Sequence, residues 1–144
     1  MIDTHCHIDF EEYDEDRDQI IKRAEEVLDA VVVSGIGYES NRGVLDLCSK
    51  YENFIYPSLG YHPVSSQNCT EEELKLTHQD IIENRDNIVA IGEVGMDYFY
   101  VKDKALREKQ REIFQTFIEL ADEYKIPLLM HVRDCEKKAL NMVS

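Results

Sequence analysis

The sequence predicts a parallel α/β fold of the barrel type, and three observations lead to that prediction. Five short apolar runs alternate with longer segments in which apolar residues recur at helical spacing. The first run is not followed by the glycine-rich loop that usually opens a Rossmann-like sheet. Polar side chains instead stand at the C-terminal ends of the first, third, fourth and fifth runs. In a (β/α)8 barrel these ends share the face that carries the active site.

The apolar runs are expected to be the strands of this fold. In chain order, the expected strands span residues 1–6, 30–36, 54–60, 87–94 and 126–132. The second run is apolar at nearly every position, and such two-sided burial is typical of a parallel strand that helices cover.

Helices are expected between the strands, because the apolar residues there follow a period of about 3.6. The helical stripes lie within residues 20–28, 44–51, 74–82 and 106–124. Thr70 and Glu73 have the spacing of a capping box in front of the third helix. The acidic residues at 11–16 indicate a solvated loop and a first helical turn. Asp134 is expected to cap a last helix over residues 136–144.

Length and composition indicate a single domain. The chain has 144 residues, of which 43% are hydrophobic and 32% charged, as expected of a packed core with a hydrated surface. No apolar run approaches the roughly 20 residues that span a bilayer. The first residues do not resemble a signal peptide, and the four cysteines have no CxxC spacing. We therefore expect a cytoplasmic protein with reduced thiols and no membrane partner.

The formal net charge of −14 argues against broad electrostatic binding of nucleic acid through a basic face. It leaves open an enzyme that holds phosphates through metal ions, because the ions supply the local positive charge.

Four residues at strand ends are candidate metal ligands. His5 and His7 project from the same side of the first strand, while Cys6 points the other way and is expected to pack. Glu93 lies near the end of an apolar strand, where a carboxylate requires a cation, either in a salt bridge or as a metal bridge. His131 closes the fifth strand. Imidazole and carboxylate groups suit Zn, Mn, Fe or Mg-class ions.

Four motifs resemble, in order and spacing, the TatD-type metal-dependent deoxyribonucleases. They are H-C-H at 5–7, G-Y-H-P at 60–63, G-E-V-G-M-D-Y at 92–98 and P-L-L-M-H-V-R-D at 127–134. Helix residues 109–114 and 119–121 are also similar to that family. The resemblance implies a TIM-barrel hydrolase of the amidohydrolase superfamily.

The same resemblance implies roles for individual residues. His5 and His7 would bind one divalent metal ion, Glu93 would bridge two ions as the catalytic carboxylate, and His131 would bind the second. His62 and Arg133 would face the phosphate of a DNA or other phosphodiester substrate, with Tyr98 nearby. The implied mechanism is two-metal hydrolysis, in which the ions polarise a phosphodiester oxygen and lower the pKa of a bound water to about 7.

The chain departs from the family in length. The family barrel has eight strands, so residues 1–144 are expected to be one incomplete domain, an N-terminal half-barrel that lacks the last three strands. A further metal-binding histidine and a catalytic aspartate of the family have no counterpart after Val132. Because an open half-barrel exposes strand edges and apolar surface, we expect weak or no activity, together with self-association or a complementing C-terminal half.

Two alternatives stay open. The chain is a non-catalytic half-barrel that binds metal or a partner, or it belongs to another amidohydrolase-type enzyme that acts on amides or lactones. Such enzymes often use a carboxylated lysine as the metal bridge, and Glu93 in that place disfavours the second alternative.

Overall fold

The five expected strands all form, and they pair in parallel in the order β1-β2-β3-β4-β5. This arrangement is seen in a computed structural model that describes residues 1–144. The strands are β1 (Ile2–Cys6), β2 (Ala30–Ser34), β3 (Ile55–Leu59), β4 (Ala90–Asp97) and β5 (Leu128–Arg133). Consecutive strands are therefore neighbours joined by helical crossovers, which is the connectivity of a (β/α)8 barrel over five of its strands.

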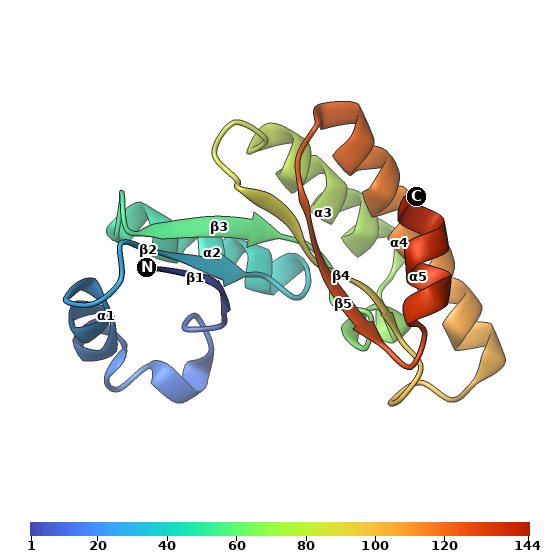
Figure 1. Ribbon diagram of the computed structural model, residues 1–144, viewed down its shortest axis with the longest axis horizontal. Helices are drawn as coiled ribbons and strands as arrows, with labels where there is room; N and C mark the ends of the chain where they lie inside the picture. The colour runs from blue at the N-terminus through green and yellow to red at the C-terminus, as the bar shows by residue number, and fades with distance from the viewer.

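The helices follow the strands as the apolar periodicity predicts. They are α1 (Arg17–Glu25), α2 (Tyr38–Lys50), α3 (Glu71–Glu83), α4 (Lys104–Tyr124) and α5 (Glu136–Val143), with short 3-10 turns η1 (Glu11–Tyr13) and η2 (Ser65–Asn68). Figure 1 shows a strongly curved sheet in which β4 and β5 are steeply inclined to β1–β3. No helix of the chain is both long enough and apolar enough to cross a bilayer.

The core lies between the sheet and its helices. Val31 and Val33 of β2 are buried on that side, together with Phe114 and Phe117 of α4. The opposite face of the sheet remains open, because successive side chains of a strand point to opposite faces. A shallow apolar surface on that face is lined by Ile2, Ala30, Val32, Tyr56 and Val89. The fold is thus a half-barrel with an accessible inner face.

The fourth strand lies three residues further along the chain than the sequence predicts. It was expected to end at Val94, but it runs to Asp97, which pairs with Arg133 of β5. Glycine and aspartate are poor strand formers, so local propensity places the end too early. Gly95 is tolerated because it lies against the His131 carbonyl, where no side chain fits. The extension puts Glu93 and Asp97 on the same face of β4.

The two capping predictions have different outcomes. Glu73 N–H donates to Thr70 Oγ1 at 3.1 Å and Thr70 N–H donates to Glu73 Oε2 at 2.8 Å, so the capping box is confirmed. The prediction for Asp134 is wrong, because Cys135 is the N-cap of α5 and Asp134 has a left-handed φ of 58°. The Asp134 amide instead donates to Glu136 Oε1.

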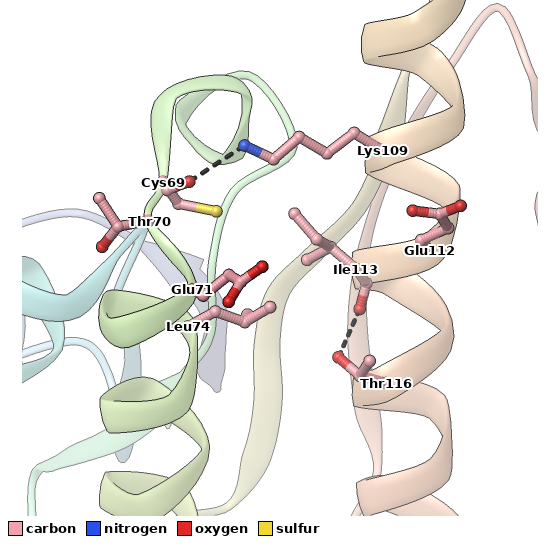
Figure 2. Close-up of a pocket in the computed structure, with 8 residues that line it drawn as sticks. All are labelled: Cys69, Thr70, Glu71, Leu74, Lys109, Glu112, Ile113 and Thr116. Carbon is pink, nitrogen blue, oxygen red and sulfur yellow. Dashed lines mark hydrogen bonds between the residues drawn. The ribbon is translucent and has the colours of Figure 1, made fainter.

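A pocket of about 350 Å³ opens between α3 and α4 on the helix side of the sheet. Figure 2 shows Lys109 reaching across it to the Cys69 carbonyl, at 3.0 Å. The pocket contains no histidine and lies apart from the candidate metal ligands.

Candidate metal centre

Four histidines surround one buried carboxylate at the C-terminal ends of the strands. The carboxylate belongs to Glu93, which is 6% exposed. Its Oε2 atom lies 3.2 Å from His5 Nε2 and 3.3 Å from His7 Nε2. Its Oε1 atom lies 3.1 Å from His131 Nδ1 and 3.8 Å from His62 Nε2. Each oxygen of Glu93 therefore faces its own pair of imidazoles.

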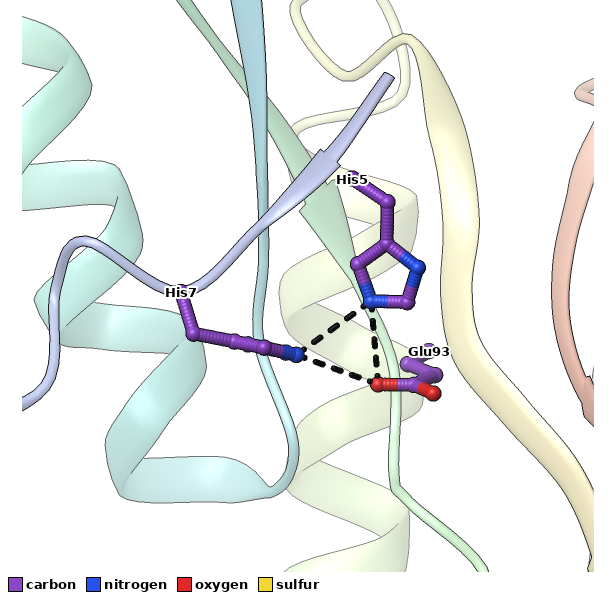
Figure 3. Close-up of side chains that lie close together, drawn as sticks. All are labelled: His5, His7 and Glu93. Carbon is purple, nitrogen blue, oxygen red and sulfur yellow. Dashed lines mark hydrogen bonds and ion pairs between the residues drawn. The ribbon is translucent and has the colours of Figure 1, made fainter. Parts of the chain in front are cut away.

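The first group consists of His5, His7 and Glu93, and Figure 3 shows the three side chains converging on one point. His7 Nδ1 lies 2.8 Å from the Ser34 carbonyl oxygen. Because a carbonyl only accepts hydrogen bonds, Nδ1 carries the proton of a neutral His7 and Nε2 presents a lone pair. That lone pair meets His5 Nε2 at 3.2 Å as well as the carboxylate. A proton on an imidazole or a divalent metal ion between these atoms relieves their repulsion, and the set of two imidazoles and one carboxylate could hold a metal ion.

The second group contains His131, whose orientation is set by Asp97. His131 Nε2 lies 2.8 Å from Asp97 Oδ2, so Nε2–H donates to the carboxylate and Nδ1 faces Glu93. A carboxylate behind a histidine in this way is a common outer partner of metal-bound imidazoles. The geometry therefore fits His131 as a ligand through Nδ1.

His62 lies in the same group, but its hydrogen bonds give it a different chemistry. The Val64 amide donates to His62 Nδ1 at 3.2 Å, and burial lowers the pKa of His62. The neutral ring therefore carries its proton on Nε2, which lies 3.2 Å from His131 Nδ1. A metal ligand needs a lone pair at that atom. His62 thus fits a hydrogen-bond donor to an anion better than a third metal ligand.

Asp97 is a site residue that the sequence analysis did not single out. It is fully buried, and its Oδ1 accepts from the Tyr100 amide at 2.7 Å. Burial alone would raise the pKa of Asp97, but the hydrogen bonds from Tyr100 and His131 lower it, so the carboxylate stays charged. An acidic residue four positions after Glu93, on the same strand face, was the available signal. It depended on knowing that β4 continues beyond Val94.

The Glu93 carboxylate stays ionised although it is buried. Burial would raise its pKa, yet the hydrogen bonds with His131 and His7 hold that pKa well below its usual value. Gln110, which is fully buried on α4, accepts from the Asp97 amide and donates to the Pro63 carbonyl. It thereby ties β4 to the loop that carries His62.

Two expected substrate contacts lie outside this cluster. The Arg133 guanidinium is exposed and stacks 3.8 Å above the Phe99 ring. Tyr98 is 8% exposed, with Arg107 4.5 Å from its ring centroid and its hydroxyl against Met96 Sδ. Tyr98 thus packs towards the helices, and the structure does not bring it together with the histidines.

Cys6 occupies the packed position expected of it, and His78 lies away from the cluster. His78 lies 3.0 Å from Thr116 Oγ1 and is edge-on to Phe117. Cys6 packs against the core and is a free thiol.

We expect protons to compete with metal at this cluster. The hydrogen bond with Glu93 raises the pKa of His7 and of His131, against the opposing effect of burial. These rings stabilise the metal-free fold below about pH 6.5, the unfolded value, and that stabilisation disappears as pH rises through their higher folded pKa values. Metal binding needs neutral imidazoles, so the affinity should rise over the same interval.

Metal titrations and thermal melts of the metal-free chain at about pH 6 and about pH 8 measure both trends, which should have opposite signs. An affinity for metal that does not change between these pH values would contradict the protonation argument.

A parallel half-barrel that gathers histidines around a buried carboxylate at its C-terminal edge has the architecture of barrel-type metal-dependent hydrolases. The family model described as "TatD related DNase" matches residues 2–144, and the chain belongs to the TatD family.

Two relatives and one solved structure illustrate the similarity. The metal-dependent hydrolase YabD of Bacillus subtilis is 33% identical over 144 residues, which cover 99% of this chain and 54% of YabD. The human deoxyribonuclease TATDN3 is 30% identical, over 99% of this chain and 56% of its own length. The crystal structure of the TatD homologue YJJV from Escherichia coli aligns with a TM-score of 0.86 at 29% identity, over 96% of this chain and 53% of YJJV. The chain therefore spans about half the length of the relatives it matches.

Proposed function

We propose that this chain supplies the metal-binding half of a hydrolase that cleaves phosphodiester bonds of DNA with two divalent metal ions. The observation that carries the proposal is the Glu93 carboxylate, whose two oxygens face separate pairs of imidazoles. A carboxylate in that position suits a bridge between two ions. The name of the human relative, a deoxyribonuclease, supports DNA as the substrate.

Each residue of the site has a separate role in this proposal. His5, His7 and Glu93 would hold the first ion, and Glu93 and His131 the second, with Zn, Mn and Mg-class ions all compatible with these groups. Ions bound there would supply Lewis acidity and an activated water at neutral pH. Asp97 keeps His131 in the tautomer that presents Nδ1. The neutral His62 is placed to donate from Nε2–H to a phosphate oxygen, and Arg133 offers a cationic contact at the same edge of the sheet.

Two alternatives make different predictions. A non-catalytic half-barrel is favoured by the open inner face, where Ile2 is 57% exposed and Val89 is 39% exposed. That surface supports self-association or a complementing second half, and either would cover it. An amide- or lactone-hydrolysing enzyme with a carboxylated lysine finds no support, because the cluster around Glu93 contains only histidines and carboxylates. A cytoplasmic location remains a prediction.

A nuclease assay on the metal-loaded chain, beside elemental analysis and light scattering, separates these functions. The proposal expects bound divalent metal and cleavage of single-stranded DNA, weak in the isolated half-barrel, that stops on chelation. Bound metal with no cleavage in a self-associated particle would favour the non-catalytic half-barrel. A chain that binds no divalent metal would refute the hydrolase and leave only a half-barrel that binds a partner.

Arg133→Ala should weaken DNA cleavage while metal content stays unchanged. Because a charge-assisted hydrogen bond is worth about 1.5–3 kcal/mol, the loss in kcat/KM should be on the order of 10-fold to 100-fold. Lys50→Ala, an exposed cation at the end of α2, is the matched control. Equal cleavage kinetics for Arg133→Ala and the wild type would remove Arg133 from the phosphate contact.

A further inference from the structure

The loop that follows β4 presents two aromatic rings to solvent beside the candidate metal centre. Phe99 is 42% exposed and Tyr100 is 64% exposed. Their rings are nearly perpendicular, at 88°, with centroids 5.0 Å apart. Large aromatic side chains usually lose most of their exposed area on folding, so two adjacent exposed rings in one loop indicate a binding surface.

The loop is held firmly despite this exposure. The Tyr100 amide donates to Asp97 Oδ1 at 2.7 Å, and Asp97 in turn orients His131. Arg107 of α4 donates to the carbonyls of Tyr98 and Val101, at 2.8 and 2.7 Å. The backbone that carries the exposed rings is therefore fixed, and Asp97 connects it by hydrogen bonds to His131 of the candidate metal centre.

Two cations accompany the rings. The Arg133 guanidinium carbon lies 3.8 Å from the Phe99 centroid and 4.9 Å from the Tyr100 centroid, so it occupies the corner between them. Lys102 Nζ lies 5.2 Å from the Phe99 centroid. Arg133 and Lys102 take part in no ion pair of the structure. Lys102 Nζ also donates to the Tyr98 carbonyl at 3.1 Å, which satisfies a hydrogen bond but leaves the charge of Lys102 unpaired.

Aromatic faces combined with free cations match one class of ligand. A nucleobase stacks on an aromatic face or a guanidinium plane, and its phosphates pair with the cation. Only an unpaired strand offers its base faces in this way, because bases in a duplex are already stacked. A purely apolar partner would leave Arg133 and Lys102 without a counter-charge.

We propose that Tyr100 and Arg133 form a stacking site for one base of a single-stranded nucleic acid, with Phe99 holding the Arg133 guanidinium in place. The position of the site next to the scissile phosphate rests on the proposed function, whereas stacking itself does not require hydrolysis. The site would hold the strand by its bases independently of their sequence, because every base has a π-face.

The test compares two strands of equal length and charge. Fluorescein-labelled oligothymidylate and an abasic strand with the same phosphates are titrated with the full chain in EDTA, and anisotropy gives each affinity. The wild type should bind the thymine strand about 10-fold more tightly than the abasic strand, as expected for one stacked base. Tyr100→Ala should lose this preference, and Tyr100→Phe should keep it. Tyr124→Ala, at the far end of α4, is the matched control and should also keep it.

Equal affinities of the wild type for the two strands would overturn the stacking site, as would an unchanged preference in Tyr100→Ala or no binding of either strand. The outcome is separable from the proposed function. Base-dependent binding by a chain that cleaves nothing with metal added would sustain the stacking site and refute hydrolysis. Cleavage by a chain whose binding does not depend on the bases would sustain hydrolysis and refute the stacking site.

Discussion

Replacing Glu93 with alanine should abolish divalent metal binding at both candidate positions. Each oxygen of this carboxylate faces two imidazoles, so its removal takes one group from both sets at once. Loss of an outer partner of a ligand alone typically costs about 10- to 100-fold in metal affinity, and loss of a shared central carboxylate should cost roughly 100-fold or more. Elemental analysis after gel filtration measures the effect directly.

The control for this variant is His78→Ala. His78 is a half-buried imidazole that contacts Thr116 and Phe117, away from the cluster, so its removal tests the loss of a histidine without touching the site. It should retain wild-type metal content. Glu93→Ala is also expected to stay folded, because it removes a buried charge together with the need to compensate it. Equal metal content in wild type and Glu93→Ala would rule out the bridging role.

Asp97→Asn is a milder test than Glu93→Ala, because it changes the hydrogen-bond partner of His131 and not a candidate metal ligand. The amide keeps the shape of the carboxylate but no longer supplies the negative charge that raises the basicity of His131. We expect metal affinity to fall by about 10-fold, with thermal stability close to that of the wild type. An unchanged affinity would mean that Asp97 only shapes the loop through the Tyr100 amide.

Most of the fold follows from local pattern, because the strands are apolar on the helix-covered face and the helices carry regular stripes. Val31 and Val33 are buried on one face of β2, and the capping box of Thr70 with Glu73 marks the start of α3. The end of β4 was not predictable in this way. Gly95 and Asp97 resemble turn residues, and only their pairing with β5 extends the strand.

The candidate site was likewise predictable only in part from the sequence. His5, His7, Glu93 and His131 were recognisable as ligand-type residues at strand ends, and the structure brings all of them together. The tautomer of His62 depends on the Val64 amide, which no residue pattern indicates. Tyr98 was grouped with the site because it is the last residue of the motif at 92–98, whereas its ring packs against Arg107 on the helix side.

Gly95→Ala should destabilise the fold more than any other single substitution considered above. Gly95 has a φ of 143°, a conformation that residues with a side chain rarely adopt. A Cβ atom there would collide with the His131 carbonyl oxygen of the paired strand. Backbone strain and overpacking each cost about 1–3 kcal/mol, so the free energy of unfolding should fall by roughly 3 kcal/mol or more.

The matched control is Gly43→Ala in α2, where a Cβ atom has nothing within 4 Å. Alanine is favoured over glycine in a helix interior by about 1 kcal/mol, so this variant should be slightly more stable than the wild type. The same chemical change is therefore expected to have opposite signs at the two positions. Urea titrations of both variants measure the difference.

The Gly95 variant also reports on the site, because Gly95 pairs with His131 in the register between β4 and β5. Relief of the collision requires these strands to separate, and separation moves Glu93 and Asp97 away from His131. Any fraction of Gly95→Ala that folds should therefore bind metal more weakly at the Glu93–His131 pair than at the His5–His7 side. Wild-type stability and wild-type metal content in this variant would show that β4 and β5 do not approach as closely as the site geometry requires.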